Sequence, residues 1–393
     1  MTSVSFFVPG RLEVFGRHTD YAGGDSLVAA VPRGITASAS PGGDGRVIVR
    51  DLQRNEQAEF SASGEGRNEG WHCYPRAVIR RLATNFPNAN LSARITFSSD
   101  LPQAAGISSS SALIIGIAEA LIACARIEES PLWREAIQTL EDRASYFGCI
   151  ENGASFGPLA GDAGVGTHGG SEDHAAIVLS RAGELRQFSY SPLRLVRVVT
   201  MPIEWTFVVA SSGVAAPKGG AVRAAYNRLS HAAAAIVARW RADHPADTRS
   251  LGELVKDGES GRLILSTELR QRLDHFVAEN ARVSIAGDAF ARGDLAAIGE
   301  LARASQLDAD RLLGSQIPQT RDLVSLASSV GAAAASSFGA GWGGSVWALV
   351  RTTDGHRFLD DWLGAYRRRY PELNAEGFVS PPSDGVRRSR GSA

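Results

Sequence analysis

The chain has 393 residues, of which 44% are hydrophobic and 21% are charged, and its formal net charge at pH 7 is −1. This length favours two packed domains, and the composition is that of an ordinary soluble globular protein. A net charge so near zero provides no electrostatic basis for binding nucleic acid or an anionic membrane. Three cysteines are too few for a disulfide framework. We therefore expect a cytoplasmic protein with neither nucleic-acid nor membrane partners.

Hydrophobic patterns along the chain predict a mixture of strands and helices. Alternating apolar residues predict strands over residues 3–15, 47–50, 91–98, 205–210 and 346–350. Helical spacing predicts helices over residues 71–82, 112–125, 131–147, 220–242 and 263–292. The segment 112–125 is apolar on nearly all sides, so we expect this helix to be buried.

Two further segments have a more specific pattern. Residues 175–179 and 185–190 flank an Arg-Ala-Gly turn at 181–183, which predicts a β-hairpin. Residues 381–393 are mostly small or polar, and we expect them to form a flexible tail.

The first chemically informative segment is residues 9–24, PGRLEVFGRHTDYAGG. It places Arg11, His18 and Asp20 between glycines that allow the backbone to turn tightly. All three side chains form hydrogen bonds suited to a ligand with many hydroxyl groups. This segment is therefore a candidate sugar loop.

A second segment, LPQAAGISSSSAL at residues 101–113, enters the predicted buried helix. Phosphates bind well at helix N-termini, where unpaired N–H groups and the helix dipole favour an anion. Gly106 lets the backbone approach the phosphate, and serine hydroxyls can donate to phosphate or bind Mg²⁺. The segment lacks the Gly-Lys-Ser/Thr of the Walker motif. One serine could simply cap the helix, but four in a row favour a phosphate site. The four serines are Ser108, Ser109, Ser110 and Ser111.

A third glycine-rich segment, FGAGWGGS, occupies residues 338–345. Taken in this order, the three segments resemble those of the GHMP sugar kinases, and residues 9–24 are similar to the galactokinase signature in particular. The resemblance implies an α/β (α+β) two-domain GHMP kinase fold, with an N-terminal ribosomal S5 domain 2-like domain and a C-terminal ferredoxin-like domain. The implied divisions are residues 1–203 with the sugar and phosphate loops, residues 204–380, and the tail at 381–393.

The resemblance also implies the activity, which is ATP- and Mg²⁺-dependent phosphorylation of the anomeric hydroxyl of a galactose-like monosaccharide. Phosphoryl transfer needs a group that takes the proton of the hydroxyl, and an aspartate held beside an arginine can do so. Arg11 matches the catalytic arginine of the family. Asp173, within GSEDH at 170–174, stands where the family has Gly-x-Met-Asp-Gln. The implied partners are a small sugar and ATP, and we favour a monomer.

Other site residues follow from the same resemblance. His18 and Asp20 fall on sugar-contacting positions, and Tyr226 resembles a tyrosine that packs on the sugar. The residues implied to bind ATP phosphates are Gly106, Ser108, Ser109, Ser110, Ser111 and Gly341.

Magnesium is implied to bind Ser110 and a carboxylate. Arg143 stands where the family has that carboxylate, so Glu151, or alternatively Glu172, would replace it. Lys218 could in addition reach an anion.

Arg17 departs from the galactokinase pattern, which has a glutamate at this position. Arginine only donates hydrogen bonds, so it cannot replace an acceptor. It could pair with the carboxylate of an acidic sugar such as a uronic acid. Alternatively, Arg17 pairs with a protein carboxylate and a neutral sugar is bound. A third hypothesis is a catalytically silent sugar- and nucleotide-binding regulator, which the presence of Arg11, Asp173 and the serines disfavours.

Overall fold

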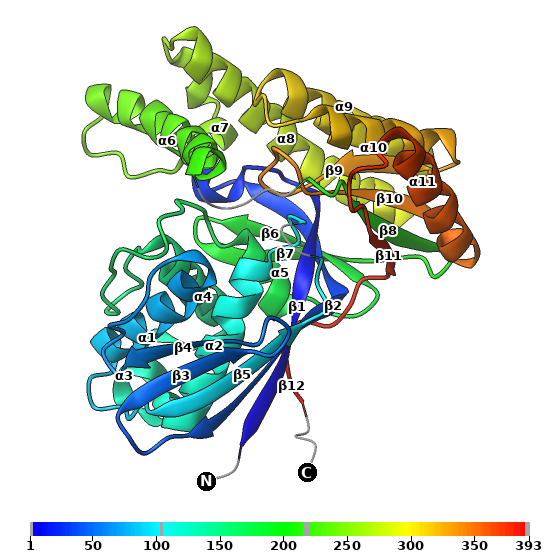
Figure 1. Ribbon diagram of the computed structural model, residues 1–393. Coiled ribbons are helices and arrows are strands. Elements are labelled where there is room, and N and C mark those ends of the chain that lie inside the picture. Colours follow the sequence, from blue (N-terminus) through cyan, green and yellow to red (C-terminus); the bar gives the residue numbers. More distant parts are fainter. Residues whose placement is uncertain (1–2, 103–104, 215–219, 390–393) are drawn as a thin grey trace.

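The structure is a computed structural model that describes residues 3–102, 105–214 and 220–389. The described residues form two sheets, each covered by helices, and the two parts pack closely on each other (Figure 1). One sheet is built mainly from the first 200 residues and the other from residues after 204. The expected boundary between 203 and 204 lies in the connection between the two sheets.

The N-terminal sheet has the strand order β12-β1-β2-β5-β3-β4, and β6 pairs with β2 and with β7. Only the β3–β5 pairing is parallel among the pairs described. The strands are β1 (Val4–Phe15), β2 (Asp25–Pro41), β3 (Arg46–Asp51), β4 (Glu56–Ser61), β5 (Ala93–Ser99), β6 (Glu184–Tyr190), β7 (Leu193–Thr200) and β12 (Arg387–Ser389).

Helices cover one face of this sheet, and the most buried of them packs directly on β1 and β2. This helix, α2, contains the apolar segment predicted to be buried, and it is buried along most of its length. Gly116 lets it lie close, because a Cβ there would be 3.1 Å from that of Ala37. The helices are η1 (Asp20–Ala22), η2 (Gly70–His72), α1 (Cys73–Asn85), α2 (Ser109–Ala125), η3 (Ile127–Glu129), α3 (Pro131–Ala136), α4 (Leu140–Asn152) and α5 (Glu172–Leu179).

The C-terminal sheet is antiparallel with the order β11-β8-β10-β9. Its strands are β8 (Trp205–Ser211), β9 (Ala334–Ser337), β10 (Ser345–Arg351) and β11 (Gly377–Ser380). The helices of this part are α6 (Gly220–Asp243), α7 (Leu251–Lys256), η4 (Glu259–Arg262), α8 (Thr267–Arg292), α9 (Leu295–Arg311), α10 (Pro318–Ser329), η5 (Thr352–Asp354) and α11 (Gly355–Arg369).

The two sheets share a hydrophobic core, which fixes one part of the molecule against the other. Helix α8 packs on β1, β2, β6 and β7 of the N-terminal sheet. Its residues Val283 and Phe290 belong to the same core cluster as Phe15 of β1 and Trp347 of β10. The rings of Phe15 and Trp347 are in edge-to-face contact at 6.2 Å. A cavity between the two parts therefore has firmly held walls.

Two expectations about local structure were wrong. The helix expected over 131–147 is two helices, because Thr139 starts α4 with a reciprocal capping box to Asp142. The hairpin expected over 175–190 does not form, since residues 172–179 are helix α5 and β6 pairs with β7 instead. A short apolar run that is buried on all sides has no periodicity that separates helix from strand.

Residues 381–389, within the expected flexible tail, follow a defined path along the N-terminal sheet. The N–H groups of Ser383 and Val386 donate to the carbonyls of Ala30 and Ile177, and β12 pairs with β1. The backbone of this segment is thus held by hydrogen bonds although its side chains are mostly polar. Among the residues described, no helix is both long and apolar enough to span a membrane.

Candidate active site

Arg11, on β1, connects three separate segments of the chain. Its Nε donates to Oδ1 of Asp173 over 2.7 Å, and its Nη1 donates to the carbonyl oxygen of Gly106 over 2.6 Å. The Nε atom also lies 3.7 Å from Oε1 of Glu172. Arg11 is buried, so these charged contacts are shielded from solvent. The residues predicted as a catalytic pair are thus in direct contact.

Asp173 lies in the first turn of α5, and its carboxylate is close to helix α2. Ser111 Oγ, on α2, lies 3.1 Å from Oδ2 of Asp173 and 2.7 Å from Oε2 of Glu151. This hydroxyl therefore contacts the carboxylates of Asp173 and Glu151, and it does not line the cavity. Ser111 is fully buried, consistent with that role.

The phosphate-loop segment enters α2 with buried hydroxyl groups that have no partner among the described residues. Ser108 precedes the helix with a positive φ of 58°, and Ser109 is its first residue. The hydroxyls of Ser108 and Ser110 are buried and have no hydrogen-bond partner among the described residues. A buried hydroxyl without a hydrogen-bond partner costs free energy in a folded protein, unless a bound ligand supplies the partner. They therefore suit an oxygen-rich ligand with its cation.

The third glycine loop packs against this segment. Ser345 Oγ donates to the carbonyl of Ala105 over 2.6 Å. Gly339 (φ +77°) leaves no room for a side chain, because a Cβ there would lie 3.0 Å from the carbonyl oxygen of Gly106. Gly341 (φ +92°) is equally constrained, since its Cβ would lie 2.5 Å from the carbonyl of Ser315. Glycine is required at both positions.

His18 lines the cavity, but both of its ring nitrogens form hydrogen bonds within the protein. Nε2 lies 3.1 Å from the carbonyl of Ala340, and Nδ1 lies 2.9 Å from the hydroxyl of Tyr21. A carbonyl only accepts, so Nε2 carries the proton and Nδ1 accepts from Tyr21. Burial, followed by the charge of Arg272, lowers the pKa of His18 to about 3. His18 therefore stays neutral and ties the sugar loop to the third glycine loop.

Asp20 and Tyr226, both predicted to contact sugar, also line the cavity. Oδ2 of Asp20 accepts the backbone N–H of Glu172 over 3.3 Å, and burial raises the pKa of Asp20 to about 6. Tyr226 lies on α6, 5.4 Å from the ring of His18. Helix α6 is held over the cavity by Asn227, whose side chain bonds the backbone of residues 166 and 168.

One cavity joins these features. It is lined by residues of the sugar loop, the phosphate loop, α4, α5, α6 and the third glycine loop. Of the predicted residues, those on its wall are Arg11, His18, Asp20, Gly106, Ser108, Glu151, Glu172, Asp173, Tyr226 and Gly341. Those not on its wall are Arg17, Ser109, Ser110 and Ser111.

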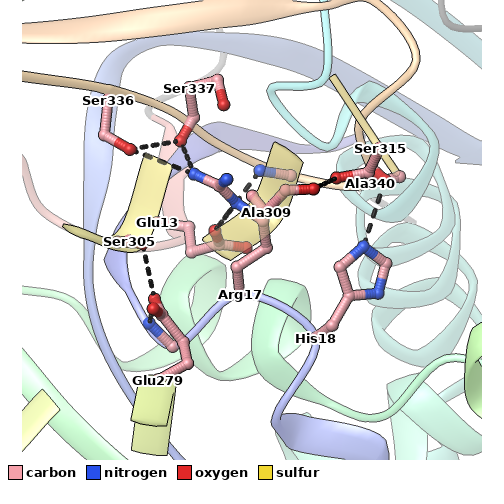
Figure 2. Close-up of polar contacts among 12 residues, drawn as sticks. Glu13, Arg17, His18, Glu279, Ser305, Ala309, Ser315, Ser336, Ser337 and Ala340 are labelled. Carbon is pink, nitrogen blue, oxygen red and sulfur yellow. Dashed lines mark hydrogen bonds and ion pairs between the residues drawn. The ribbon is translucent and has the colours of Figure 1, made fainter. Parts of the chain in front are cut away.

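Arg17 points away from this cavity, toward β9 (Figure 2). Its Nη2 donates to the carbonyl of Ser337 and, over 3.2 Å, to Oγ of Ser336, while its Nε lies 3.6 Å from Oε1 of Glu13. The guanidinium is therefore used within the protein, as one of the two interpretations of Arg17 required. A pairing with an acidic sugar finds no support in this arrangement.

Two carboxylates were considered for magnesium, and their surroundings differ. Glu151 lies on the cavity wall, with Oε2 3.2 Å from Nε2 of His174. Glu172 also lies on the wall, but its carboxyl group is close to Arg11 and Glu13. Arg143 forms ion pairs with Glu119 and Glu128, so it takes no part in the cavity wall. Lys218 lies outside the described residues.

Sequence reasoning missed Glu13, which lies on the cavity wall with Glu172. Glu13 also accepts the N–H of Gly339 over 3.4 Å. A signal was present, because residues 11 and 13 of one strand point to the same face. A strand that presents Arg11 to the site must also present Glu13.

Comparison with known proteins gives consistent matches. The galactokinase galactose-binding signature matches residues 2–41, the GHMP kinase N-terminal domain matches 74–154, and the GHMP kinase C-terminal family matches 286–367. A galactokinase of Roseiflexus sp. (strain RS-1) is 28% identical over 383 residues, covering 97% of this chain and 91% of its own. A galactokinase of Halalkalibacterium halodurans is 28% identical over 399 residues, covering 99% of this chain and 93% of its own.

Solved structures share the fold. Lactococcus lactis galactokinase complexed with galactose superposes with a TM-score of 0.81 at 23% identity, covering 98% of this chain and 95% of its own. The mevalonate kinase of Methanococcus jannaschii superposes with a TM-score of 0.60 at 13% identity, covering 98% of each chain.

Proposed function

Because the chain belongs to the GHMP kinase family and is an ATP-dependent sugar kinase, we propose that it phosphorylates the anomeric hydroxyl of galactose or a closely similar sugar. The observation that carries this proposal is the contact of Arg11 with Asp173 on a cavity that the phosphate loop also lines. The two galactokinases that span nearly the whole chain support the choice of sugar.

In this proposal Asp173 accepts the proton of the attacking hydroxyl. The guanidinium of Arg11 keeps an opposite charge 2.7 Å from the carboxylate, which favours its ionised form. Arg11 also holds the carbonyl of Gly106, so the base and the phosphate loop keep a fixed separation. Such alignment of base, acceptor and phosphoryl group supplies much of the catalysis in phosphoryl transfer.

The phosphate loop and its neighbours would hold ATP with Mg²⁺. The N-terminus of α2 and the hydroxyl of Ser108 supply donors for phosphate oxygens. The unpartnered hydroxyl of Ser110 and the carboxylate of Glu151 are oxygen donors of the kind that Mg²⁺ prefers. The cation would neutralise charge on the transferred phosphoryl group when bound.

Asp20 and Tyr226 would bind the sugar, Asp20 as an acceptor for hydroxyl groups and Tyr226 as a packing surface. Glu13 supplies the further acceptor that Arg17 cannot. Since the Arg11–Asp173 pair is intact, the geometry supports catalysis over a silent regulatory role.

The test is a coupled ADP-release assay of the purified protein with ATP, Mg²⁺ and a panel of hexoses. We expect release with galactose, and a product phosphorylated at C1 by NMR. Release with none of the sugars, while ATP still binds, would overturn the proposal.

A further inference from the structure

Two carboxyl groups on the cavity wall are in direct contact. Glu13 comes from β1 and Glu172 from the start of α5, and their side chains are only 5% and 6% exposed. Glu172 is close enough to hydrogen-bond Glu13, and this proximity is one of the influences that lower the pKa of Glu13. An arginine lies beside each of them, with Nε of Arg11 3.7 Å from Glu172 and Nε of Arg17 3.6 Å from Glu13.

A hydrogen bond between two carboxyl groups requires a proton on one of them. Burial, followed by the charges of Glu13 and Asp20, raises the pKa of Glu172 well above its ordinary value. Burial and the neighbouring carboxyl groups therefore favour a proton on this pair in the free protein. This proton occupies a place that another small cation with hydrogen-bond donors could take.

The charges around the cavity also favour a positively charged ligand. Of the described residues, five carboxyl groups but only two guanidinium groups line its wall. Of the two, Arg11 is already paired with Asp173, and the other is Arg223 of α6. Arg17 contributes nothing to the wall. ATP with its magnesium ion is itself anionic, so an anionic acceptor would meet repulsion. A positively charged acceptor would be attracted.

We propose that the Glu13–Glu172 pair binds a protonated amino group, so that the preferred acceptors of this kinase are amino sugars of galactose-like shape. The inference rests on the proposed function and names its substrate class. The ammonium group would donate to both carboxylates, and the proton that they share would pass to solvent. Hydrogen bonds between charged partners are the strong ones in proteins.

The geometry also suggests where the amino group sits on the ring. Glu172 lies within 3.7 Å of the same Arg11 atom that binds Asp173. The pair is therefore near the hydroxyl from which Asp173 takes the proton. An amino group on C2, next to the anomeric carbon, best meets this requirement.

The experiment compares kcat/KM of the wild-type protein for galactose, 2-amino-2-deoxygalactose and 6-amino-6-deoxygalactose at pH 7. We expect the 2-amino sugar to exceed galactose by about tenfold or more, the lower end of the range for hydrogen bonds to charged groups. A preference for the 6-amino sugar alone would support the substrate class and overturn the C2 placement. If galactose is phosphorylated and neither amino sugar is better, the inference fails and the proposed function stands. If no sugar is phosphorylated, the proposed function itself fails.

Variants assign the effect to the pair. Glu172→Gln and Glu13→Gln keep the shape of each side chain but leave only one carboxylate, so the ratio of amino sugar to galactose should fall toward one. Glu119→Gln is the matched control, because Glu119 is also a buried glutamate paired with an arginine but lies away from the cavity. It should leave the ratio unchanged. A ratio that survives both pair variants would overturn the assignment.

Discussion

Nε of Arg11 lies 2.7 Å from Oδ1 of Asp173, although 162 residues separate the two in the chain. The contact is charged and partly buried, so each side chain compensates the charge of the other. It is also the point where a strand of the sugar loop meets the helix that carries the proposed base.

The first prediction removes the charge of the base. Asp173→Asn should lower kcat by about 100-fold or more, the scale of general-base contributions. The amide keeps the shape of the side chain, so calorimetry should find ATP affinity nearly unchanged. Turnover close to that of the wild type would refute the role of Asp173.

The second prediction concerns the backbone of the phosphate loop. Gly106 has φ +71°, and its carbonyl is held by Arg11. Valine is strained at this φ and would bring a branched side chain toward Gly344, 3.7 Å from the Cβ position. We expect Gly106→Val to abolish ATP binding in calorimetry. Gly183→Val is the control, since Gly183 has φ +76° with open space around it. ATP affinity that is equal in the two variants would contradict the assignment.

Local sequence was enough to select three loops that line one cavity, because each loop is defined by residue types that stand close together in the chain. Gly106, Ser108 and Gly341 were selected from short motifs. The buried helix α2, which follows Ser108, was predicted from its apolar composition. The direction of Arg17 could not be predicted in this way. Its partner Ser337 is 320 residues away, and no local pattern indicates which distant acceptor satisfies a buried charge.

The placement of Asp173 illustrates a different limit. Its motif was recognised, but the apolar residues after it were assigned to a strand although they form α5. Full burial removes the alternation that separates the two. The motif thus led to a residue that lies on the cavity and contacts Arg11, while the element that orients it was predicted wrongly.

The third prediction tests whether Arg17 is structural. Arg17→Ala removes one of the two cations near Glu13, the other being Arg11, and removes the donors to Ser336 and Ser337. Breaking a buried ion pair from one side costs about 3–5 kcal/mol, so the free energy of unfolding should fall by about that amount in urea titration. Arg46→Ala breaks an exposed pair with Glu59 and should cost less than about 1 kcal/mol. Equal losses in the two variants would show that Arg17 is not held as described.

Arg17 also provides a test of substrate charge. Arg17→Glu should not change the preference between galactose and galacturonate, because its side chain lies away from the cavity wall. We expect galacturonate to remain the poorer substrate in both proteins. A shift of the preference by tenfold or more would place Arg17 in contact with the sugar.

The last prediction follows from Asp20. Burial raises its pKa to about 6, so it is largely ionised at pH 7 and becomes protonated below pH 6. Protonation removes an acceptor for sugar hydroxyls, and KM for the sugar should rise by up to about tenfold for each pH unit below 6. His18 cannot cause this change, because its pKa is about 3.

The same shift has a consequence for stability, with a defined sign. The folded protein holds a proton on Asp20 up to about pH 6, whereas the unfolded chain releases it near the ordinary value of 3.8. The stabilising contribution of this group is therefore complete below pH 3.8 and is lost as the pH rises through 6. Asp20→Asn removes the dependence, so between pH 5 and pH 7 the wild type should lose stability relative to this variant in urea titrations. If the difference in unfolding free energy stays constant over that range, Asp20 does not titrate near pH 6, and the rise in KM must come from another group.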